Sequence, residues 1–300
     1  MQNHTKGIVY AAITAFFWGF LAIALKVAVR KVDPVTVVWI RFVIAFVMLS
    51  VWQAASNPQA FKILTKPPLL LIFAALALSW NYMGYMLGIH HTTPSNAQLF
   101  IQTGPLILAI AGFVIFKEKL LRNQIIGFTI AILGFSFFYR DQLQAFFETA
   151  GTYKLGILFT LSGALAWAVY AILQKILVRN YSVDSLNLML FGLPAIIYLP
   201  FVNFQQLLSL HWSWWFLLFF LGANTFIAYT CIGKALKYTE ANKVSIIIIL
   251  NPMITFITMG ILTQLNVSWV EHERFSLITI IGALLVFSGA ILVAKKTKKQ

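Results

Sequence analysis

Long apolar runs separated by short polar breaks dominate the chain. Each run is about as long as the roughly 20 predominantly apolar residues that a helix needs to cross a bilayer. The runs are too long, and alternate too little, for membrane β-strands. We therefore predict an all-α polytopic membrane protein with ten transmembrane helices. The expected helices cover residues 7–29, 34–53, 68–89, 94–116, 122–139, 154–178, 184–208, 213–236, 241–265 and 275–294.

Residues that favour turns separate these apolar runs. Proline cannot continue a helix from the preceding segment, and polar side chains let the backbone turn in water. The breaks are Asp33-Pro34, Asn57-Pro58, Pro67-Pro68, Thr93-Pro94 and the polar run from Arg140 to Thr152.

An internal repeat relates the two halves of the chain. When the sequence is shifted by 149 residues, seven of the sixteen positions from 15 to 30 are identical to their partners. A cleaved leader would have no reason to match an internal helix, so we expect the first apolar run to be a retained helix. The identical pairs are Ala15/Ala164, Trp18/Trp167, Ala22/Ala171, Ile23/Ile172, Lys26/Lys175, Val29/Val178 and Arg30/Arg179.

The repeat continues toward the end of each half. A shift of 147 residues aligns Pro105 with Pro252, and a shift of 155 aligns the glycine-flanked segments 127–134 and 282–289. The larger shift predicts an insertion near 266–274. We therefore divide the chain into two five-helix repeats, residues 1–150 and 151–300. Because five is odd, the second repeat must enter the membrane in the opposite sense, which makes the repeats inverted.

The composition excludes several classes of protein. Hydrophobic residues make up 60% of the chain and charged residues only 10%, with a mean hydropathy of +0.85. Water-soluble domains carry about 25% charged residues, and disordered chains carry few apolar ones. A single cysteine, Cys231, excludes a disulfide scaffold. The lipid bilayer is therefore the expected surroundings.

The basic residues indicate how the chain is oriented. The formal charge is +14, and in a membrane protein such an excess marks cytoplasmic loops rather than a nucleic-acid surface. We predict a multi-pass protein of the inner (cytoplasmic) membrane with both termini in the cytoplasm and no nucleic-acid partner. Arg41 then lies within a span. Fifteen basic residues lie inside (Lys6, Lys62, Lys66, Lys117, Lys119, Arg122, Lys175, Arg179, Lys234, Lys237, Lys243, Lys295, Lys296, Lys298, Lys299) and six outside (Lys26, Arg30, Lys31, Arg140, Lys154, Arg274).

Several weak motifs recur in a defined order along the chain. They are the tryptophan-centred segments AFFWGFLAI and ALAWAVYAI, Arg41-Phe42, the segment TTPSNAQ, Pro105 followed by Glu118, and a glycine-rich fifth helix in each half. With these motifs the chain resembles the EamA-type branch of the drug/metabolite transporter superfamily over nearly its whole length. The resemblance implies ten helices in two inverted repeats. It also implies export of small metabolites such as amino acids, or of drug-like compounds.

The two halves also differ in ways that matter for function. The second half has Gln264 and Leu265 at the place of Glu118, and Leu190 at the place of Arg41. It also carries the additional loop WVEHERF. We therefore do not expect the halves to be functionally equivalent.

Polar residues at membrane depth are the candidate substrate-binding groups, because burying an unpaired polar group is costly unless it is used. An amide could instead only bind a neighbouring helix, and a tryptophan could only pack. Gln98 and Gln102 lie four residues apart and share a helix face. The full set is Trp18, Arg41, Asn81, Tyr85, Gln98, Gln102, Trp167, Tyr170, Asn224 and Tyr229.

Arg41 and two prolines each allow two interpretations. Arg41 lies about 10 Å along its helix from Pro34. It either contacts an anionic or carboxylate-bearing substrate or ties its helix to carbonyl groups of neighbouring helices. Pro105 and Pro252 remove helical hydrogen bonds to Ile101 and Ile248, which suits either a gating hinge or a static kink.

The positions of the acidic and histidine residues do not indicate a proton relay or a metal site. All eight acids fall in or beside loops, so no carboxylate is expected at the midplane to relay protons. His90-His91 and Glu271-His272-Glu273 lack the spacing of metal sites, and we predict no metal and no cofactor.

The sequence lacks HExxH and GxSxG, which argues against an enzyme. A channel would need a continuous polar stripe. An alternating-access transporter of a small molecule is therefore favoured, with a channel-like facilitator as the alternative.

Overall fold

The computed structural model describes residues 2–118, 122–138, 140, 151–267 and 276–294. These residues are helical or connect helices, and none of them forms a strand. The helices are α1 (Gln2–Ala28), α2 (Pro34–Ser56), η1 (Pro58–Phe61), α3 (Lys62–Thr65), α4 (Leu69–His91), α5 (Pro94–Phe100), α6 (Thr103–Val114), α7 (Arg122–Phe138), α9 (Thr152–Leu177), α10 (Val183–Tyr198), η2 (Leu199–Phe201), α11 (Phe204–Leu208), α12 (Trp212–Tyr238), α13 (Ala241–Ile248), α14 (Asn251–Gln264) and α15 (Leu277–Ala294).

Within these residues, eight stretches of helix are long and apolar enough to cross a membrane. Two shorter apolar helices, Ile125–Phe137 and Ile280–Leu292, lie in α7 and α15. Parts of two predicted regions, the polar run 140–152 and the insertion near 266–274, lie outside the described residues. The protein is therefore an all-helical, multi-pass membrane protein.

Two of the predicted helices are interrupted. The expected helix 94–116 divides into α5 and α6 at Ile101 and Gln102, and the expected helix 241–265 divides into α13 and α14 at Ile249 and Leu250. In each case a proline follows within a few residues, and its ring lacks an N–H and clashes with the carbonyl group four residues earlier. The prolines thus occupy the first turn of α6 and α14, where a backbone N–H has no helical partner.

The helix predicted over residues 184–208 is present, but the prediction of its C-terminal end was wrong. α10 ends at Tyr198, and the chain continues through the short helices η2 and α11. Pro200 explains this end, because it cannot donate to the preceding turn. Pro194, by contrast, is accommodated inside α10.

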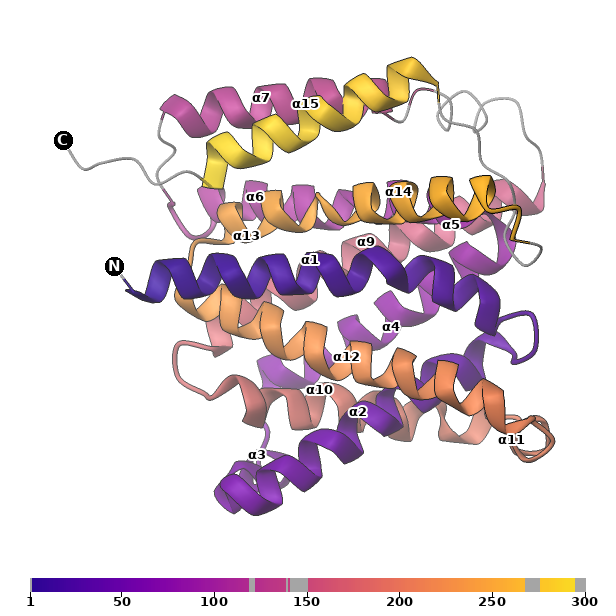
Figure 1. The fold of residues 1–300 in the computed structure, drawn as a ribbon. Coiled ribbons are helices and arrows are strands. Elements are labelled where there is room, and N and C mark those ends of the chain that lie inside the picture. The colour runs from indigo at the N-terminus through magenta and orange to yellow at the C-terminus, as the bar shows by residue number, and fades with distance from the viewer. Residues whose placement is uncertain (1, 119–121, 139, 141–150, 268–275, 295–300) are drawn as a thin grey trace.

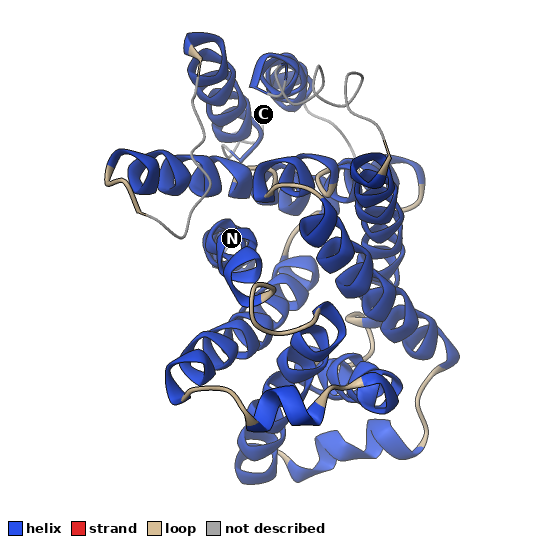
Figure 2. Ribbon diagram, turned by 90° about the vertical axis from the view of Figure 1, so that its right-hand side faces the viewer, coloured by secondary structure: helices blue, strands red, loops and turns tan. Residues whose placement is uncertain are grey.

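The helices form a bundle in which segments from both halves alternate (Figure 1). α1 packs on α12, α4 on α9, and α2 on α10. α7 and α15 lie side by side along one edge, as Figures 1 and 2 both show. Glycines let this pair approach closely: a Cβ atom at Gly134 would lie 2.6 Å from the backbone nitrogen of Val286.

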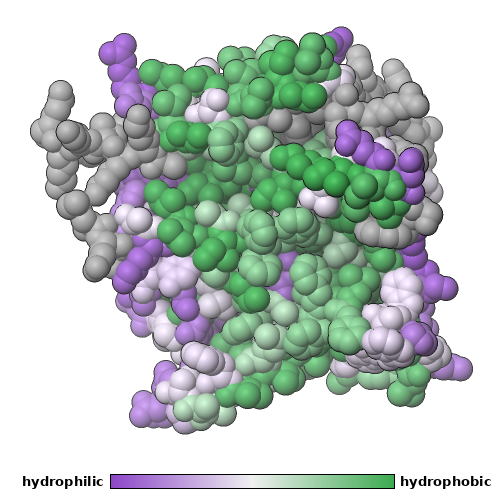
Figure 3. Space-filling model, viewed as in Figure 1, coloured by the Kyte–Doolittle hydropathy of each residue, from purple (hydrophilic) through white to green (hydrophobic). Residues whose placement is uncertain are grey.

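The outer surface of the bundle is apolar. Trp52, Phe216 and Leu277 are among its most exposed large side chains. Figure 3 shows hydrophobic residues over the middle of one face and hydrophilic residues toward its left and right ends, where the helices begin and end. Such a belt fits a helical bundle surrounded by lipid.

Candidate functional site

A central pocket lies where the broken helices meet the rest of the bundle. Its empty volume, including open space at its mouth, is about 520 Å³. Eight of the ten predicted substrate-binding residues line it, together with Pro105. They are Trp18, Arg41, Asn81, Tyr85, Gln98, Gln102, Trp167 and Tyr229.

Two predicted residues and one predicted hinge are not in the lining. Tyr170 is fully buried behind the pocket wall, where its ring lies 5.5 Å from that of Tyr229. Asn224 is also buried, and Pro252 follows the lining residue Asn251. Five further residues line the pocket and were not predicted from the sequence: Leu21, Tyr82, Ile101, Ile248 and Asn251.

An amide cluster joins the two broken helices across the pocket. The Nε2 atoms of Gln98 and Gln102 donate to Oδ1 of Asn251, at 2.7 and 2.8 Å. The hydroxyl of Tyr85 donates to Oε1 of Gln98. The remaining Oε1 of Gln102 is buried without a hydrogen-bond partner. α5 and α14, which belong to different halves, are thus linked by side chains that face the pocket.

Asn81 and Asn224 make similar bonds to neighbouring helices. Nδ2 of Asn81 donates to the carbonyl of Gly163 in α9 at 3.0 Å, and Nδ2 of Asn224 donates to that of Phe17 in α1 at 2.7 Å. Asn81 also accepts a longer bond, 3.4 Å, from the hydroxyl of Tyr229. Each amide therefore ties together two helices, and Asn81 does so at the pocket surface.

Aromatic rings from both halves form a continuous wall. Trp18 lies edge-on to Trp167, with ring centroids 5.9 Å apart, and tilted against Tyr229 at 5.5 Å. Tyr82 lies 5.5 Å from the same Tyr229 ring. These distances are in the range of favourable aromatic pairs. The wall offers a ligand flat apolar faces.

Arg41 brings a positive charge to this pocket. Its Nε donates to Oγ1 of Thr225 at 3.3 Å, and its guanidinium carbon lies 4.3 Å from the centroid of the Tyr82 ring. The ion pairs among the described residues join Lys175 to Glu118 and Lys243 to Glu240, and neither includes Arg41.

Two lysines at equivalent positions bind the ends of two helices. Nζ of Lys26 donates to the carbonyls of Ile89 and Thr92 at the end of α4, at 3.2 and 2.7 Å. Nζ of Lys175 donates to the carbonyls of Leu236, at 2.9 Å, and Thr239 at the end of α12. A cation is favourable there because the last carbonyls of a helix lack partners and carry partial negative charge.

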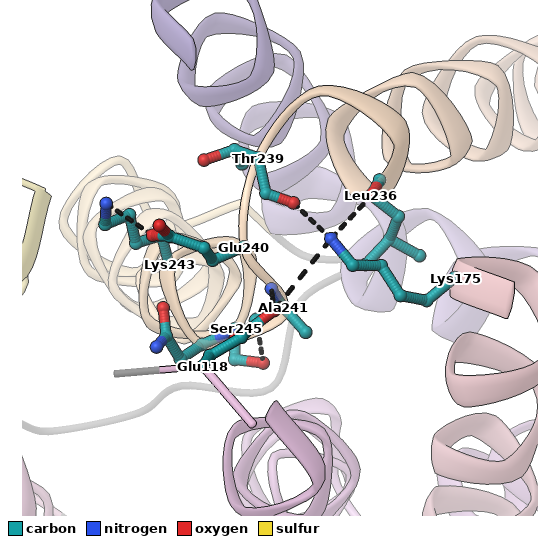
Figure 4. A network of polar contacts seen from close by, with 9 residues as sticks. Glu118, Lys175, Leu236, Thr239, Glu240, Ala241, Lys243 and Ser245 are labelled. Carbon is teal, nitrogen blue, oxygen red and sulfur yellow. Dashed lines mark hydrogen bonds and ion pairs between the residues drawn. The ribbon is translucent and has the colours of Figure 1, made fainter. Parts of the chain in front are cut away.

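Glu118 joins the second of these lysine sites to α13 (Figure 4). Its Oε1 lies 3.9 Å from Nζ of Lys175 and accepts from the backbone nitrogen of Ala241 at 2.7 Å. Its Oε2 accepts from the backbone nitrogen of Asn242 at 3.1 Å. The side chain is 8% exposed. Although Glu118 follows α6 in a loop, as expected from the sequence, it is buried and caps a helix of the other half.

The backbone around Glu118 is shaped to place this carboxylate. Lys117 has a left-handed conformation, with φ of 56°, which turns the chain back toward α6. Gly112 lies beneath the carboxylate, because a Cβ atom there would be 2.6 Å from Oε2 of Glu118. The cap that Glu118 forms on α13 thus depends on Gly112 in the last turn of α6 and on Lys117 in the loop that follows.

The residues considered for metal binding form no cluster in the described chain. No group of three His, Cys, Asp or Glu side chains that could hold a metal was found among the described residues. His90 and His91 lie next to each other, with ring centroids 5.0 Å apart. Glu271, His272 and Glu273 lie outside the described residues.

Comparisons with known proteins agree with the fold and the membrane location. The model of the EamA-like transporter family matches residues 5–140 and 154–295. An "Uncharacterized transporter" of Haemophilus influenzae is 32% identical, covering 98% of this chain and 96% of that protein. The "Uncharacterized inner membrane transporter YhbE" of Escherichia coli (strain K12) is 28% identical, covering 97% of this chain and 91% of that protein.

A solved structure supports the same fold. A protein described only as "Crystal structure of protein" superimposes with a TM-score of 0.72, at 17% identity, and 97% of each chain is covered. The family and the names of the relatives indicate membrane transport rather than catalysis. Because the family model matches nearly the entire sequence, the chain belongs to the EamA-like transporter family.

Proposed function

We propose that the protein is an alternating-access transporter that exports small metabolites, such as amino acids, or drug-like compounds across the cytoplasmic membrane. In this proposal ten helices cross the membrane as two inverted five-helix repeats, residues 1–150 and 151–300, with both termini in the cytoplasm. The substrate binds in the central pocket. The interruptions beside Pro105 and Pro252 act as hinges.

The observation that carries the proposal is the composition of the central pocket wall. Trp18, Arg41 and Gln98 come from the first half, and Trp167 and Asn251 come from the second. Two packed repeats that rock about a site between them expose it to each side of the membrane in turn. A pocket lined by one half alone would not be opened and closed by such a motion.

The paired lysines support an inverted arrangement. Lys26 and Lys175, which are 149 residues apart, each bind the end of the third long helix of their own half. α1, which carries Lys26 in its last turn, ends at the right of Figure 1, whereas α12 ends at the left beside α13. Equivalent contacts therefore lie at opposite ends of the bundle, as inversion requires.

Counterflow in proteoliposomes tests transport directly. Vesicles loaded with an unlabelled substrate should take up the labelled substrate in a saturable way, whereas a channel would show no such exchange. Gln98→Ala should impair exchange because it removes the amide that joins the broken helices, and the exposed Gln59→Ala is the control. Non-saturable flux, or unchanged exchange in Gln98→Ala, would contradict the proposed site.

The pocket lining also predicts how transport is coupled. The described lining residues include no carboxylate, so exchange should proceed without an imposed pH gradient.

Reporter fusions at residue 3 and after Gln300 test the orientation, and both should report the cytoplasm. Opposite locations for the two ends would contradict an even number of spans.

A further inference from the structure

The central pocket contains a positive charge that the described chain does not neutralise. Arg41 is the sole charged side chain among the residues that line the pocket. It is only 2% exposed, and neither ion pair of the described residues includes it. A buried cation without a counter-ion is unfavourable, since it loses hydration and gains no opposing charge. An anion bound in the pocket would supply that charge.

The guanidinium also has hydrogen-bonding capacity left over. Arginine has five N–H donors. Among the described residues, its side chain makes one hydrogen bond of good geometry, from Nε to Thr225, and otherwise lies over the ring and near the hydroxyl of Tyr82. The cation–π contact with the ring stabilises the charge of the guanidinium, but it does not provide a hydrogen-bond acceptor for the remaining N–H groups. Had Arg41 served only to tie helices together, we would expect bonds to backbone carbonyls, and the described residues provide none.

A second polar group in the same pocket wall lacks a hydrogen bond of good geometry. The hydroxyl of Tyr82 is buried near the side chains of Arg41, Thr225 and Tyr229 but makes no hydrogen bond of good geometry with them, and its ring lies against the guanidinium of Arg41 in the pocket wall. A buried hydroxyl without such a bond is costly. Arg41 and Tyr82 therefore present adjacent unused donors to the same space.

We propose that Arg41 and Tyr82 form a carboxylate-binding subsite, and that the substrate is a small organic monocarboxylate. The guanidinium fork binds the two carboxylate oxygens, and the Tyr82 hydroxyl donates a further hydrogen bond. This proposal rests on the proposed transport function and specifies the chemical class of its substrate.

The single charge and the surroundings narrow the ligand further. The planar fork of arginine matches a carboxylate in a bidentate geometry. A phosphate monoester carries more negative charge, and no second cation lines the pocket among the described residues. Trp18, Trp167 and Tyr229 offer apolar faces to the rest of the molecule. An apolar part of the substrate, such as an aromatic ring, therefore packs on these rings, and any further polar group meets the amides of Gln98, Gln102 and Asn251.

Matched acids and amides test the subsite on the purified full chain. Phenylacetate and indole-3-acetate are each compared with the neutral amide of the same size, by thermal shift and by inhibition of counterflow. We expect each acid to bind the wild type at least about tenfold more tightly than its amide, because a charge-assisted pair is lost in the amide. In Arg41→Gln the acid and the amide should bind equally.

Two further variants keep the test valid if Arg41→Gln does not fold. Tyr82→Phe retains the ring beneath the guanidinium and should weaken acid binding several-fold while leaving amide binding unchanged. Arg179→Gln is the matched control, because Arg179 also lies over an aromatic ring, that of Phe116, but is exposed and outside the pocket. It should keep the wild-type preference for acids.

The outcomes separate this proposal from the proposed function. Binding or exchange of amides as readily as acids would overturn the carboxylate subsite and leave the transport function intact. An unchanged acid preference in both Arg41→Gln and Tyr82→Phe would also overturn it. Failure of acids and amides alike to bind or exchange would overturn the subsite, whereas saturable exchange of a neutral or zwitterionic compound would then preserve the transport function.

Discussion

The two ends of the bundle use the same lysine contact but cap their neighbouring helices differently. At one end Lys175 binds the end of α12, and Glu118 from the other half caps α13. At the other end Lys26 binds the end of α4, and Thr93 caps α5 through its own side chain, which accepts from the backbone nitrogen of Asn96. The lysine contact is thus the same at both ends, whereas the neighbouring helix is capped by a nearby residue at one end and by a residue distant in sequence at the other.

A shared turn shows where the two ends diverge. Lys117 and Asn266, 149 residues apart, both have left-handed backbones, with φ of 56° and 51°. Because each left-handed residue is followed by one of them, Glu118 corresponds to Val267 in the second half. The sequence shift had instead placed Gln264 and Leu265 opposite Glu118. The backbone of the turn is therefore common to both halves, and the side chain that follows it decides whether a carboxylate reaches the neighbouring helix.

The largest expected effect follows from removing the carboxylate. Glu118→Ala leaves Lys175 without its ion-pair partner and two backbone N–H groups of α13 without acceptors. Loss of one member of a buried pair costs about 3 kcal/mol, so the free energy of unfolding should fall by about that amount. Chemical unfolding in detergent measures it. An unchanged unfolding free energy would show that the two ends do not differ in the way described.

A double-mutant cycle should sharpen the comparison. Lys175→Met and Glu118→Ala should be non-additive by about 1 kcal/mol, because the two side chains contact each other. Lys26→Met provides the control, since Lys26 binds the end of α4 while Glu118 caps α13 beside the end of α12. The effects of Lys26→Met and Glu118→Ala should add. Equal coupling in both cycles would mean that the ion pair is not specific to one end.

The smallest expected effect compares the two residues that precede α5 and α13. Thr93→Ala should lower the unfolding free energy by about 1 kcal/mol, because it removes a side-chain cap. Glu240→Ala should change it by less than about 0.5 kcal/mol, because Glu240 makes no cap bond and pairs with Lys243 at a partly exposed position. The same unfolding assay checks both variants. A larger loss in Glu240→Ala would indicate that α13 is capped locally after all.

Much of the architecture could be predicted from local signals. Apolar length and turn residues locate most helices, and the four-residue spacing of Gln98 and Gln102 predicts that both face one side. The break beside Pro105 follows from the missing N–H of proline. The end of α10 at Tyr198 was missed although Pro200 marks it, because the surrounding residues remain apolar and the hydrophobic signal runs on.

The site was less accessible to sequence reasoning because it depends on long-range contacts. Asn251 was not among the predicted residues, because its role as acceptor for two glutamines requires α5 and α14 to meet. Tyr82 is adjacent to the predicted Asn81, yet its place beside Arg41 depends on how α2 packs on α4. The burial of Glu118 depends on the left-handed turn at Lys117, which no local propensity specifies.

The close approach of Gly112 to Glu118 has an evolutionary consequence. Any side chain at Gly112 would displace the carboxylate and crowd the backbone nitrogen of Asn242, so the benefit of Glu118 exists only in a lineage that retains the glycine. Conversely, once Glu118 is lost, selection no longer protects that glycine for this purpose. The two positions are therefore expected to be inherited as a pair, and descendants that lose one should drift at the other.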